Sequence, residues 1–385
     1  MSRFGKLLRA AGCVALTATG APAVAQSYSA FADPATDVVG AGFHRRSAPQ
    51  AYYHPQNCPP ATVPGTTVPG MTTPPMTTPP TAPAPSEPAA IAPGLPDLFA
   101  GADAGPTAGL GGYIDNALPM TQFRLRYDSA YGNNRPDRAN FFYAKCGCFG
   151  SPNAVGPPLP ETSVDSQTLY SYVEYAVTPR ASLFANVPVR FINPEQNRNA
   201  AGVSDLQFGG KYALLYDPNR VLSVQLQVIV PTGDTRLGLG SGSTWIEPGL
   251  LYQEQLSCRW QVFGQLKDQI PLTRVSDFAG NVLTYGVGTS YRVAEGSWGY
   301  VAPVAEVVGW TVLSGRELNP DLGNDVSAEG ATIVNAKFGV RFGLGRPDFD
   351  GPNPTRSDLY IGYGRALTGE VWYKNMFRVE YRWLF

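Results

Sequence analysis

The chain ends with the stretch N-M-F-R-V-E-Y-R-W-L-F, residues 375–385. Every second side chain of this stretch is apolar or aromatic: Phe377, Val379, Tyr381, Trp383 and Phe385. The positions between them include Arg378, Glu380 and Arg382, so the pattern has the period of two that indicates a β-strand. One apolar face and one charged face suit a barrel strand between lipid and a wet lumen. The edge strand of a soluble sandwich is the alternative.

The same alternation recurs upstream between turn residues, and it predicts twelve strands in all. The expected ranges are 122–131, 168–177, 182–191, 205–214, 221–231, 245–256, 260–270, 282–293, 300–312, 332–343, 359–367 and 375–385. The first strand shows the contrast clearly, because Phe123, Leu125 and Tyr127 alternate with Arg124 and Arg126. We therefore expect an all-β fold, a transmembrane antiparallel β-barrel of about twelve strands.

The lengths of the connections support closure of this sheet. The first, third, fifth, seventh and ninth connections are long, and the second, fourth, sixth and eighth are short. The rule breaks at the last pair, because residues 344–358 form a long connection and residues 368–374 a short one. An even strand number with short turns on one side is typical of an outer-membrane barrel and not of a Greek-key sandwich.

The composition agrees with strands separated by turns. The chain has 385 residues, 42 of them Gly and 36 Pro, and only 15% are charged. The formal net charge of -1 gives no electrostatic reason to expect nucleic acid as a partner. After the first thirty residues no stretch has the roughly eighteen uninterrupted apolar residues of a membrane helix. A membrane crossing would therefore use strands.

The N-terminal third predicts export and a spacer. Residues 1–25 combine Arg3, Lys6 and Arg9 with an apolar run and a small-residue cleavage site, which indicates a signal peptide. Lipidation at Cys13 is a weaker alternative. Residues 26–96 become Pro/Thr-rich, which predicts a disordered periplasmic spacer, either a passive tether or an arm that reaches the cell wall. Residues 97–119 are a Gly-rich connector or plug, and residues 120–385 are the barrel.

Several motifs resemble a known family. The runs Gly209-Gly-Lys-Tyr212, Val230-Pro-Thr-Gly-Asp234 and Tyr360-Ile-Gly-Tyr-Gly-Arg-Ala-Leu-Thr-Gly369 are similar to the MetA-pathway-of-phenol-degradation type of outer-membrane transporter. The resemblance spans about residues 120–385 and implies a twelve-stranded barrel with a role in uptake of small, often hydrophobic compounds. The aromatic ending with Tyr381, Trp383 and Phe385 also resembles the signal that the barrel assembly machinery reads in bacterial outer-membrane proteins.

The inward faces of the predicted strands collect charges of both signs. They are Arg124, Arg126, Asp128, Glu174, Arg190, Asp205, Lys211, Glu247, Lys267, Arg292, Glu306, Lys337, Arg341, Arg378, Glu380 and Arg382. Rings of charge set selectivity in pores, so these residues are candidates for a constriction that selects solutes. The alternative is an ion-pair network that fills a narrow barrel and keeps it shut.

Enzyme chemistry is not expected. The only two histidines, His44 and His54, precede the barrel, so a Ser-His hydrolase site in the barrel is excluded and a His-rich zinc site is not expected. Phosphate-binding and dinucleotide motifs do not occur. We predict no cofactor and no metal.

Four cysteines remain after signal cleavage, in a compartment that allows disulfides. Cys58 lies in the spacer and Cys258 in a predicted periplasmic turn, whereas Cys146 and Cys148 share the first external loop. We expect a Cys58–Cys258 bridge, with Cys146 and Cys148 bonded to each other or reactive. Two cysteines alone make a poor metal site.

The sequence thus predicts an outer-membrane barrel that contacts lipid and conducts or transports small molecules. The alternative is a closed structural barrel whose Pro-rich arm binds the cell wall or a periplasmic partner.

Overall fold

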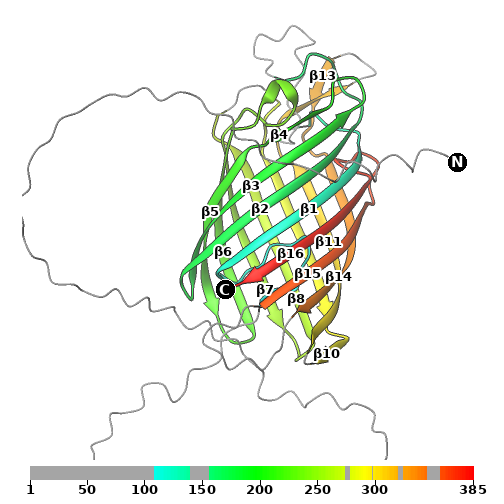
Figure 1. Ribbon diagram of the computed structural model, residues 1–385. Helices are drawn as coiled ribbons and strands as arrows, with labels where there is room; N and C mark the ends of the chain where they lie inside the picture. Colours follow the sequence, from blue (N-terminus) through cyan, green and yellow to red (C-terminus); the bar gives the residue numbers. More distant parts are fainter. Residues whose placement is uncertain (1–107, 139–155, 274–277, 297, 320–323, 345–355) are drawn as a thin grey trace, which may run out of the picture. The chain divides into compact units, whose positions relative to one another are not determined.

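The computed structural model describes residues 108–138, 156–273, 278–296, 298–319, 324–344 and 356–385 (Figure 1). The predicted signal peptide, the Pro/Thr-rich spacer and Cys58, Cys146 and Cys148 lie outside these residues. No helix in the described part of the chain is both long and apolar enough to span a bilayer.

Twelve strands form a closed antiparallel β-barrel, as the alternation predicts. They are β1 (Gln122–Asn133), β2 (Val164–Thr178), β3 (Ala181–Pro194), β5 (Leu206–Tyr216), β6 (Arg220–Val230), β7 (Trp245–Gln255), β8 (Trp260–Pro271), β9 (Val282–Tyr291), β11 (Gly299–Val312), β14 (Thr332–Leu344), β15 (Arg356–Ala366) and β16 (Asn375–Leu384). Strand bounds differ from the predicted ones by a few residues; β2, for example, begins at Val164 and not at residue 168.

Two pairings close the sheet. The last strand pairs with the first, with Leu384 opposite Gln122, and β9 pairs with β11, with Val282 opposite Val312. All other neighbours in the wall are hydrogen-bonded in turn. Because the sheet is closed, no strand in the wall is an edge strand. Every strand amide in the wall can therefore hydrogen-bond to a neighbouring strand, as the interior of a bilayer requires.

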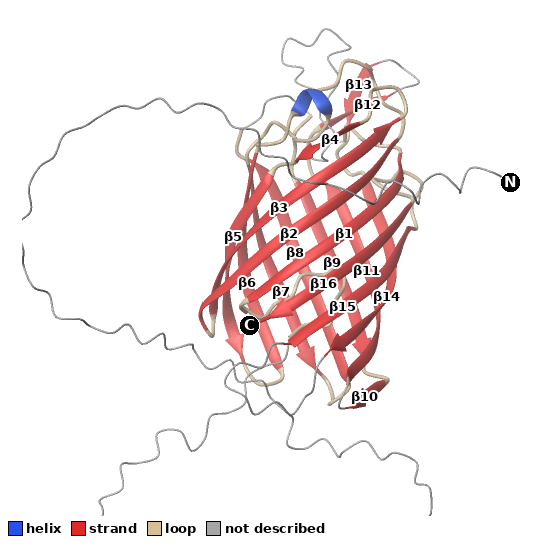
Figure 2. Cartoon of the chain, viewed as in Figure 1, coloured by secondary structure: helices blue, strands red, loops and turns tan. Residues whose placement is uncertain are grey.

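The two ends of the barrel differ (Figure 2). One end, here called the loop end, carries β4 (Ala200–Val203), the hairpin of β12 (Arg316–Asn319) with β13 (Asn324–Ser327), and the short 3-10 helix η2 (Thr235–Leu237). The other end, here called the turn end, has the C-terminus, tight turns and β10 (Ala294–Gly296). In outer-membrane barrels short turns are periplasmic and long loops external, so the turn end faces the periplasm.

Local chemistry explains the tight turns. Between β5 and β6, Pro218 and Asn219 occupy the corner positions, where both residue types are favoured. Asp217 and Arg220 exchange backbone hydrogen bonds of 2.9 and 3.2 Å across this turn. The long connection between β14 and β15, which broke the predicted alternation of long and short connections, also falls at the turn end. Most of this connection lies outside the described residues.

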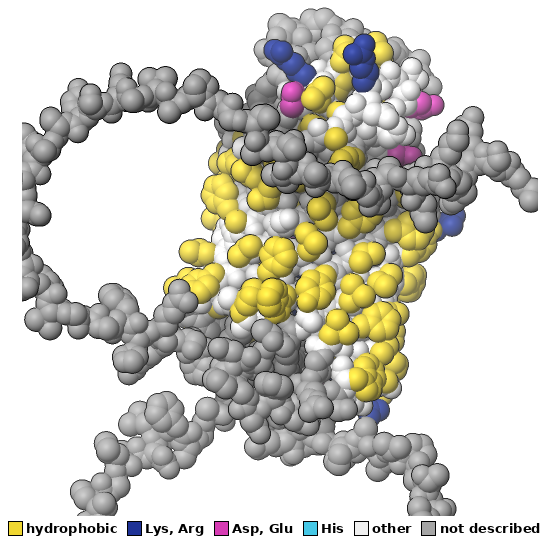
Figure 3. Space-filling model, viewed as in Figure 1, with side chains coloured by type: hydrophobic (Ala, Val, Ile, Leu, Met, Phe, Trp, Pro, Cys, Tyr) yellow, Lys and Arg dark blue, Asp and Glu magenta, His cyan; other side chains and the backbone are white. Residues whose placement is uncertain are grey.

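Side chains alternate between the outside and the lumen as predicted. On β16, Phe377 is 53% exposed and Arg378 is 6% exposed. Figure 3 shows hydrophobic side chains covering the wall of the barrel, whereas the basic and acidic ones visible in this view lie near its ends. The outer surface is thus a lipid-facing apolar belt, and the polar side chains lie inside.

The apolar belt predicts that the destabilisation caused by an outward-facing charge depends on its depth in the membrane. Val287 lies midway along β9 and is 68% exposed, whereas Leu367 is 65% exposed just past the end of β15. Val287→Arg should destabilise the barrel by about 2–4 kcal/mol, and Leu367→Arg by about 0–1 kcal/mol, because a charge near the membrane surface stays hydrated. The measurement is the temperature at which folded protein in bilayers loses its compact gel mobility. Equal effects of the two variants would contradict a lipid-facing β9.

Candidate functional site in the barrel lumen

Residues 108–121, here called the luminal segment, precede β1 and cross the inside of the barrel. The segment has no regular secondary structure, so its backbone groups cannot bond to one another in a helix or ladder. Side chains from the barrel wall bond to them instead. The amide of Leu110 donates to Gln261 on β8 at 2.7 Å, and the Ala117 carbonyl accepts from Ser223 on β6 at 2.6 Å. Part of the predicted Gly-rich connector or plug thus lies in the lumen.

One carboxylate binds three successive amides of this segment. Glu306 on β11 accepts hydrogen bonds from the backbone N–H groups of Gly112 at 3.2 Å, Tyr113 at 2.9 Å and Ile114 at 2.9 Å. Glu306 is buried. Successive amides that converge on one anion form a concave nest, and hydrogen bonds to an ionised acceptor are stronger than neutral ones. Glu306 therefore fixes the middle of the luminal segment.

Three arginines bind the carbonyls on the N-terminal side of the nest. Arg341 donates to the Gly111 carbonyl at 2.5 Å, Arg378 to the Gly112 carbonyl at 2.8 Å, and Arg382 to the Gly109 carbonyl at 3.1 Å. A guanidinium has five donors in a planar fork, so each arginine can serve a carbonyl and a carboxylate together.

Carboxylates of the wall balance these arginines. Arg378 makes two hydrogen bonds of 2.7 Å to Asp128, and Arg382 binds Asp358 at 2.5–2.8 Å. Arg341 binds Asp358 as well, and it reaches Glu380 at 3.0 Å. All of these side chains are buried. This half of the lumen, on β1 and β14–β16, thus holds two groups of ion pairs: Arg378 with Asp128, and Arg341 and Arg382 with Asp358 and Glu380.

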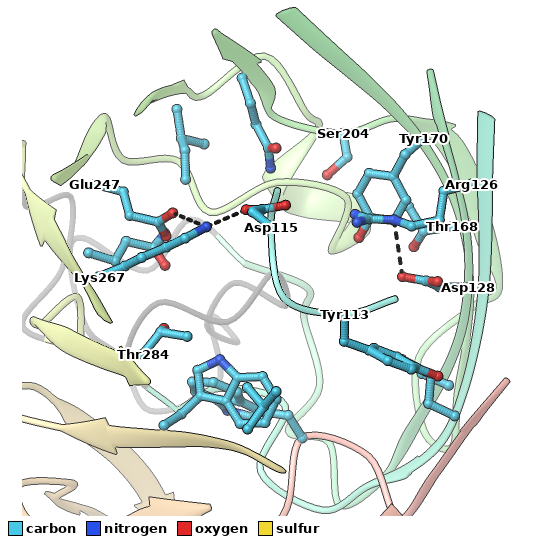
Figure 4. Close-up of a pocket in the computed structure, with 18 of the residues that line it drawn as sticks. Tyr113, Asp115, Arg126, Asp128, Thr168, Tyr170, Ser204, Glu247, Lys267 and Thr284 are labelled. Carbon is cyan, nitrogen blue, oxygen red and sulfur yellow. Dashed lines mark hydrogen bonds and ion pairs between the residues drawn. The ribbon is translucent and has the colours of Figure 1, made fainter. Parts of the chain in front are cut away.

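The opposite half of the lumen holds a smaller set of pairs. Lys267 lies between Asp115 of the luminal segment, at 2.5 Å, and Glu247 on β7, at 3.4 Å (Figure 4). Lys211 bonds to Glu174 at 3.0 Å and to the Asn116 carbonyl at 3.1 Å. The segment is therefore attached to both sides of the barrel.

A glycine in the segment permits its closest approach to the wall. A Cβ at Gly112 would lie 2.0 Å from the ring of Tyr360, which is fully buried in the lumen. Gly339 on the neighbouring strand β14 and Gly362 on β15, the strand of Tyr360 itself, also lack the side chains that would collide with this ring. The Tyr360 ring can therefore lie flat between the wall and the segment.

A cavity of about 350 Å³ occupies the lumen next to the luminal segment. Figure 4 shows Tyr113 and Asp115 of the segment, and Arg126 with Asp128 on β1, among the residues that line it. A second cavity of about 170 Å³ adjoins it, and both are lined by Arg126, Asp115, Gln207, Gln227, Glu247 and Lys267. Polar space therefore continues past the segment along β5–β8.

The connection between β15 and β16 closes over part of the loop end. Its residues Val371, Trp372 and Tyr373 are buried, and Trp372 and Tyr373 line the larger cavity. Arg138, which is fully buried, binds Glu317 of β12 and Glu370 of this connection. The first, ninth and eleventh connections are thus tied together by ion pairs above the lumen.

None of the sixteen charged residues predicted to face the lumen is exposed, and they differ in what they contact. Glu306, Arg341, Arg378, Arg382, Lys211 and Lys267 bond to the luminal segment or to its Asp115, and Glu174 accepts from its Met120 amide at 3.4 Å. Arg124 and Glu380 pair at 3.7 Å, and Arg126, Glu247, Arg190 and Lys337 line the larger cavity. Asp205 and Arg292 lie just outside the strands.

Those last two residues have local partners. Asp205 accepts from the amides of Gly233 at 3.0 Å and Ser241 at 2.7 Å, so it holds the Gly-rich loop at the loop end while also lining the cavity. Arg292 lies past β9 at the turn end, where it pairs with Glu295 at 3.6 Å.

Several residues of the site are not marked by any pattern in the sequence. Asp115 and Tyr113 belong to a segment without periodicity. Asp358 joins β15, but the predicted strand began one residue later because no apolar alternation precedes it. Trp372 and Tyr373 lie in the short connection 368–374, which has no strand alternation.

Cys258 is disulfide-bonded, and it lies in the turn between β7 and β8 at the turn end. All other cysteines are outside the described residues, so the Cys58–Cys258 pairing stays a prediction. Within the described residues no group of three or more His, Cys, Asp or Glu side chains could hold a metal ion.

The closed wall, its apolar outer face and its polar lumen define a membrane-spanning β-barrel of the outer-membrane type. Residues 159–302 match the family model described as "Putative MetA-pathway of phenol degradation". This match confirms, over those residues, the resemblance predicted from the motifs at residues 209–212 and 230–234.

Solved structures of channels and transporters resemble the fold at low identity. The COG4313 outer membrane channel from Pseudomonas putida F1 is 17% identical, with 71% of this chain and 97% of that chain covered and a TM-score of 0.42. The NanC porin is 10% identical, with 69% of this chain and 99% of that chain covered and a TM-score of 0.38. The Pseudomonas putida toluene transporter TodX is 11% identical, with 69% of this chain and 88% of that chain covered and a TM-score of 0.31. No curated protein matches the sequence.

The ion pairs at the loop end predict a response to acid. The hydrogen bond from Arg138 lowers the pKa of Glu370, whose ordinary value is about 4.3. Because the pKa of Glu370 is lower in the folded protein, its ionised carboxylate stabilises the fold fully at pH values above the ordinary pKa. This stabilisation is lost as the pH falls through the lowered pKa. Between about pH 5 and pH 3, the unfolding temperature of the wild-type barrel should therefore fall more than that of Glu370→Gln. Glu329→Gln, at an exposed position, should behave as wild type; parallel falls in all three would contradict the assignment.

Proposed function

We propose that this protein is an outer-membrane channel or transporter for small molecules, with the charged lumen as its selectivity element. The observation that carries the proposal is the polar space beside the luminal segment, where the two cavities share Asp115, Lys267 and Glu247. A solute that follows this space passes charges of both signs, which orient and discriminate permeating molecules.

The solute we propose is small, and hydrophobic or aromatic. The larger cavity is lined by Trp245, Trp310 and Trp372 as well as by charges. The matching family model is described by phenol degradation, and one of the similar structures is a toluene transporter. These names concern other proteins, but they support an aromatic solute for this chain too.

A closed structural barrel is the second candidate. The luminal segment is bonded to strands on both sides of the lumen, so it narrows any route to the periplasm. In that case the Pro-rich arm, residues 26–96, would supply the function by contacting the cell wall or a periplasmic partner. Recognition of Tyr381, Trp383 and Phe385 by the barrel assembly machinery is proposed in both cases.

Single-channel recording in planar bilayers tests the proposal. Glu247→Gln should shift the ion selectivity of the refolded protein toward anions, because it removes a negative charge from the shared part of the two cavities. Glu254→Gln is the matched control: it lies on the same strand, in an outward-facing position at the turn end. Removal of residues 26–96 should leave the conductance unchanged.

Silence from a protein shown to be folded would contradict the channel and favour the closed barrel. A selectivity change in Glu254→Gln as large as in Glu247→Gln would contradict the route along β7.

A further inference from the structure

Lys337 on β14 is a buried cation that faces the larger cavity. Its side chain is 3% exposed and lies among aromatic rings: its Nζ atom is 3.9 Å from the ring centre of Tyr113, 5.1 Å from that of Trp310 and 5.5 Å from that of Tyr373. An ammonium group has three donors. Within the described residues Lys337 has no ion pair within 4 Å.

The natural partner of Lys337 is engaged elsewhere. Glu306 lies directly opposite Lys337 in the β11–β14 register, where opposite charges would be expected to pair. Its carboxylate instead accepts the amides of residues 112–114. The luminal segment therefore takes the carboxylate that would otherwise neutralise the lysine.

The next carboxylate is engaged as well. Asp128 makes both of its hydrogen bonds to Arg378, at 2.7 Å each, and Arg126 lies 3.6 Å from it. Arg378 also stacks on Tyr113, with 4.0 Å between its Cζ atom and the ring centre. This corner of the cavity thus holds three cations, and Asp128 already serves two of them. A buried charge without a counterion is costly, so the corner favours an anion.

The walls of the corner are flat aromatic surfaces. Trp310 packs edge-on against Trp372 and Tyr373, with ring centres 5.8 and 6.2 Å apart. Both tryptophans, Tyr373 and Met376 line the cavity beside Lys337. The hydroxyl of Tyr113 is buried without a hydrogen-bond partner in the described part of the chain. Aromatic rings prefer stacked or edge-to-face neighbours, so this surface suits a ring more than an alkyl chain.

We propose that this corner is a binding site for a small aromatic monoanion, such as an aromatic carboxylate. The anionic group bonds to Lys337 and the Tyr113 hydroxyl, and the ring packs against Trp310, Trp372 and Tyr373. This proposal rests on the proposed function, because it names the solute class that the lumen admits. It also predicts that the lumen distinguishes charged from neutral aromatic solutes, a distinction that the fold alone does not predict.

The test is calorimetric titration of the full mature protein, folded in detergent, with benzoate and two analogues. Benzamide keeps the ring without the charge, and cyclohexanecarboxylate keeps the charge without the aromatic ring. Benzoate should bind at least about tenfold more tightly than benzamide, because a hydrogen bond to a charged group is lost in the amide. It should also bind more tightly than cyclohexanecarboxylate, which cannot stack.

Variants locate the site. Lys337→Met should abolish the preference for benzoate over benzamide, and Lys337→Arg should retain it. Lys374→Met, which removes an exposed lysine from the connection between β15 and β16, should leave it unchanged. Folding of each variant is checked by gel mobility, and the comparison of the three ligands on the wild type needs no variant.

Equal affinities of wild type for benzoate and benzamide would overturn the anion site, and equal affinities for benzoate and cyclohexanecarboxylate would overturn the aromatic one. A benzoate preference that survives Lys337→Met would place the site elsewhere and also overturn the proposal. Binding is measured without a bilayer current, so a silent channel that still binds benzoate would separate failure of the proposed function from failure of this site.

Discussion

The structure inside this barrel depends on the hydrogen bonds between the Glu306 carboxylate and three successive amides of the luminal segment. That segment forms neither helix nor strand, so its backbone must find partners on the wall or leave buried polar groups unpaired. Glu306 supplies a single buried anion for residues 112–114, and the arginines of β14 and β16 supply donors for the carbonyls of residues 109–112.

This arrangement also sets the electrostatics of the lumen. Arg341, Arg378 and Arg382 pair with carboxylates of β1, β15 and β16 while they hold the segment, so these charges serve structure. On β5–β8 the pairs are fewer and adjoin polar space, around Lys267 and Glu247. Because Glu306 is diverted to the segment, Lys337 faces the cavity without an ion pair among the described residues. We therefore propose that the two interpretations of the luminal charges, network and selectivity element, apply to different sides of one lumen.

Much of the wall could be predicted from the sequence, because a period of two between lipid and water leaves a clear pattern on each strand. The strand count and the inward position of residues such as Arg378 followed from alternation, and closure followed from alternation together with the lengths of the connections. The luminal segment could not be placed in this way, since its contacts depend on single backbone groups that match wall residues about a hundred or more positions away, as with Gly112 and Glu306. Trp372 and Tyr373 were missed because a short connection gives no sign that it folds inward.

Amide hydrogen exchange of the folded protein tests most directly whether Glu306 holds the luminal segment. In the wild type, the amides of Gly112, Tyr113 and Ile114 should be strongly protected, and Glu306→Gln should increase their exchange while the amides of β11 and β14 stay protected. Gln keeps the shape of the side chain but removes the charge that strengthens all three bonds. Unchanged protection of these three amides in Glu306→Gln, or rapid exchange in the wild type, would contradict the account.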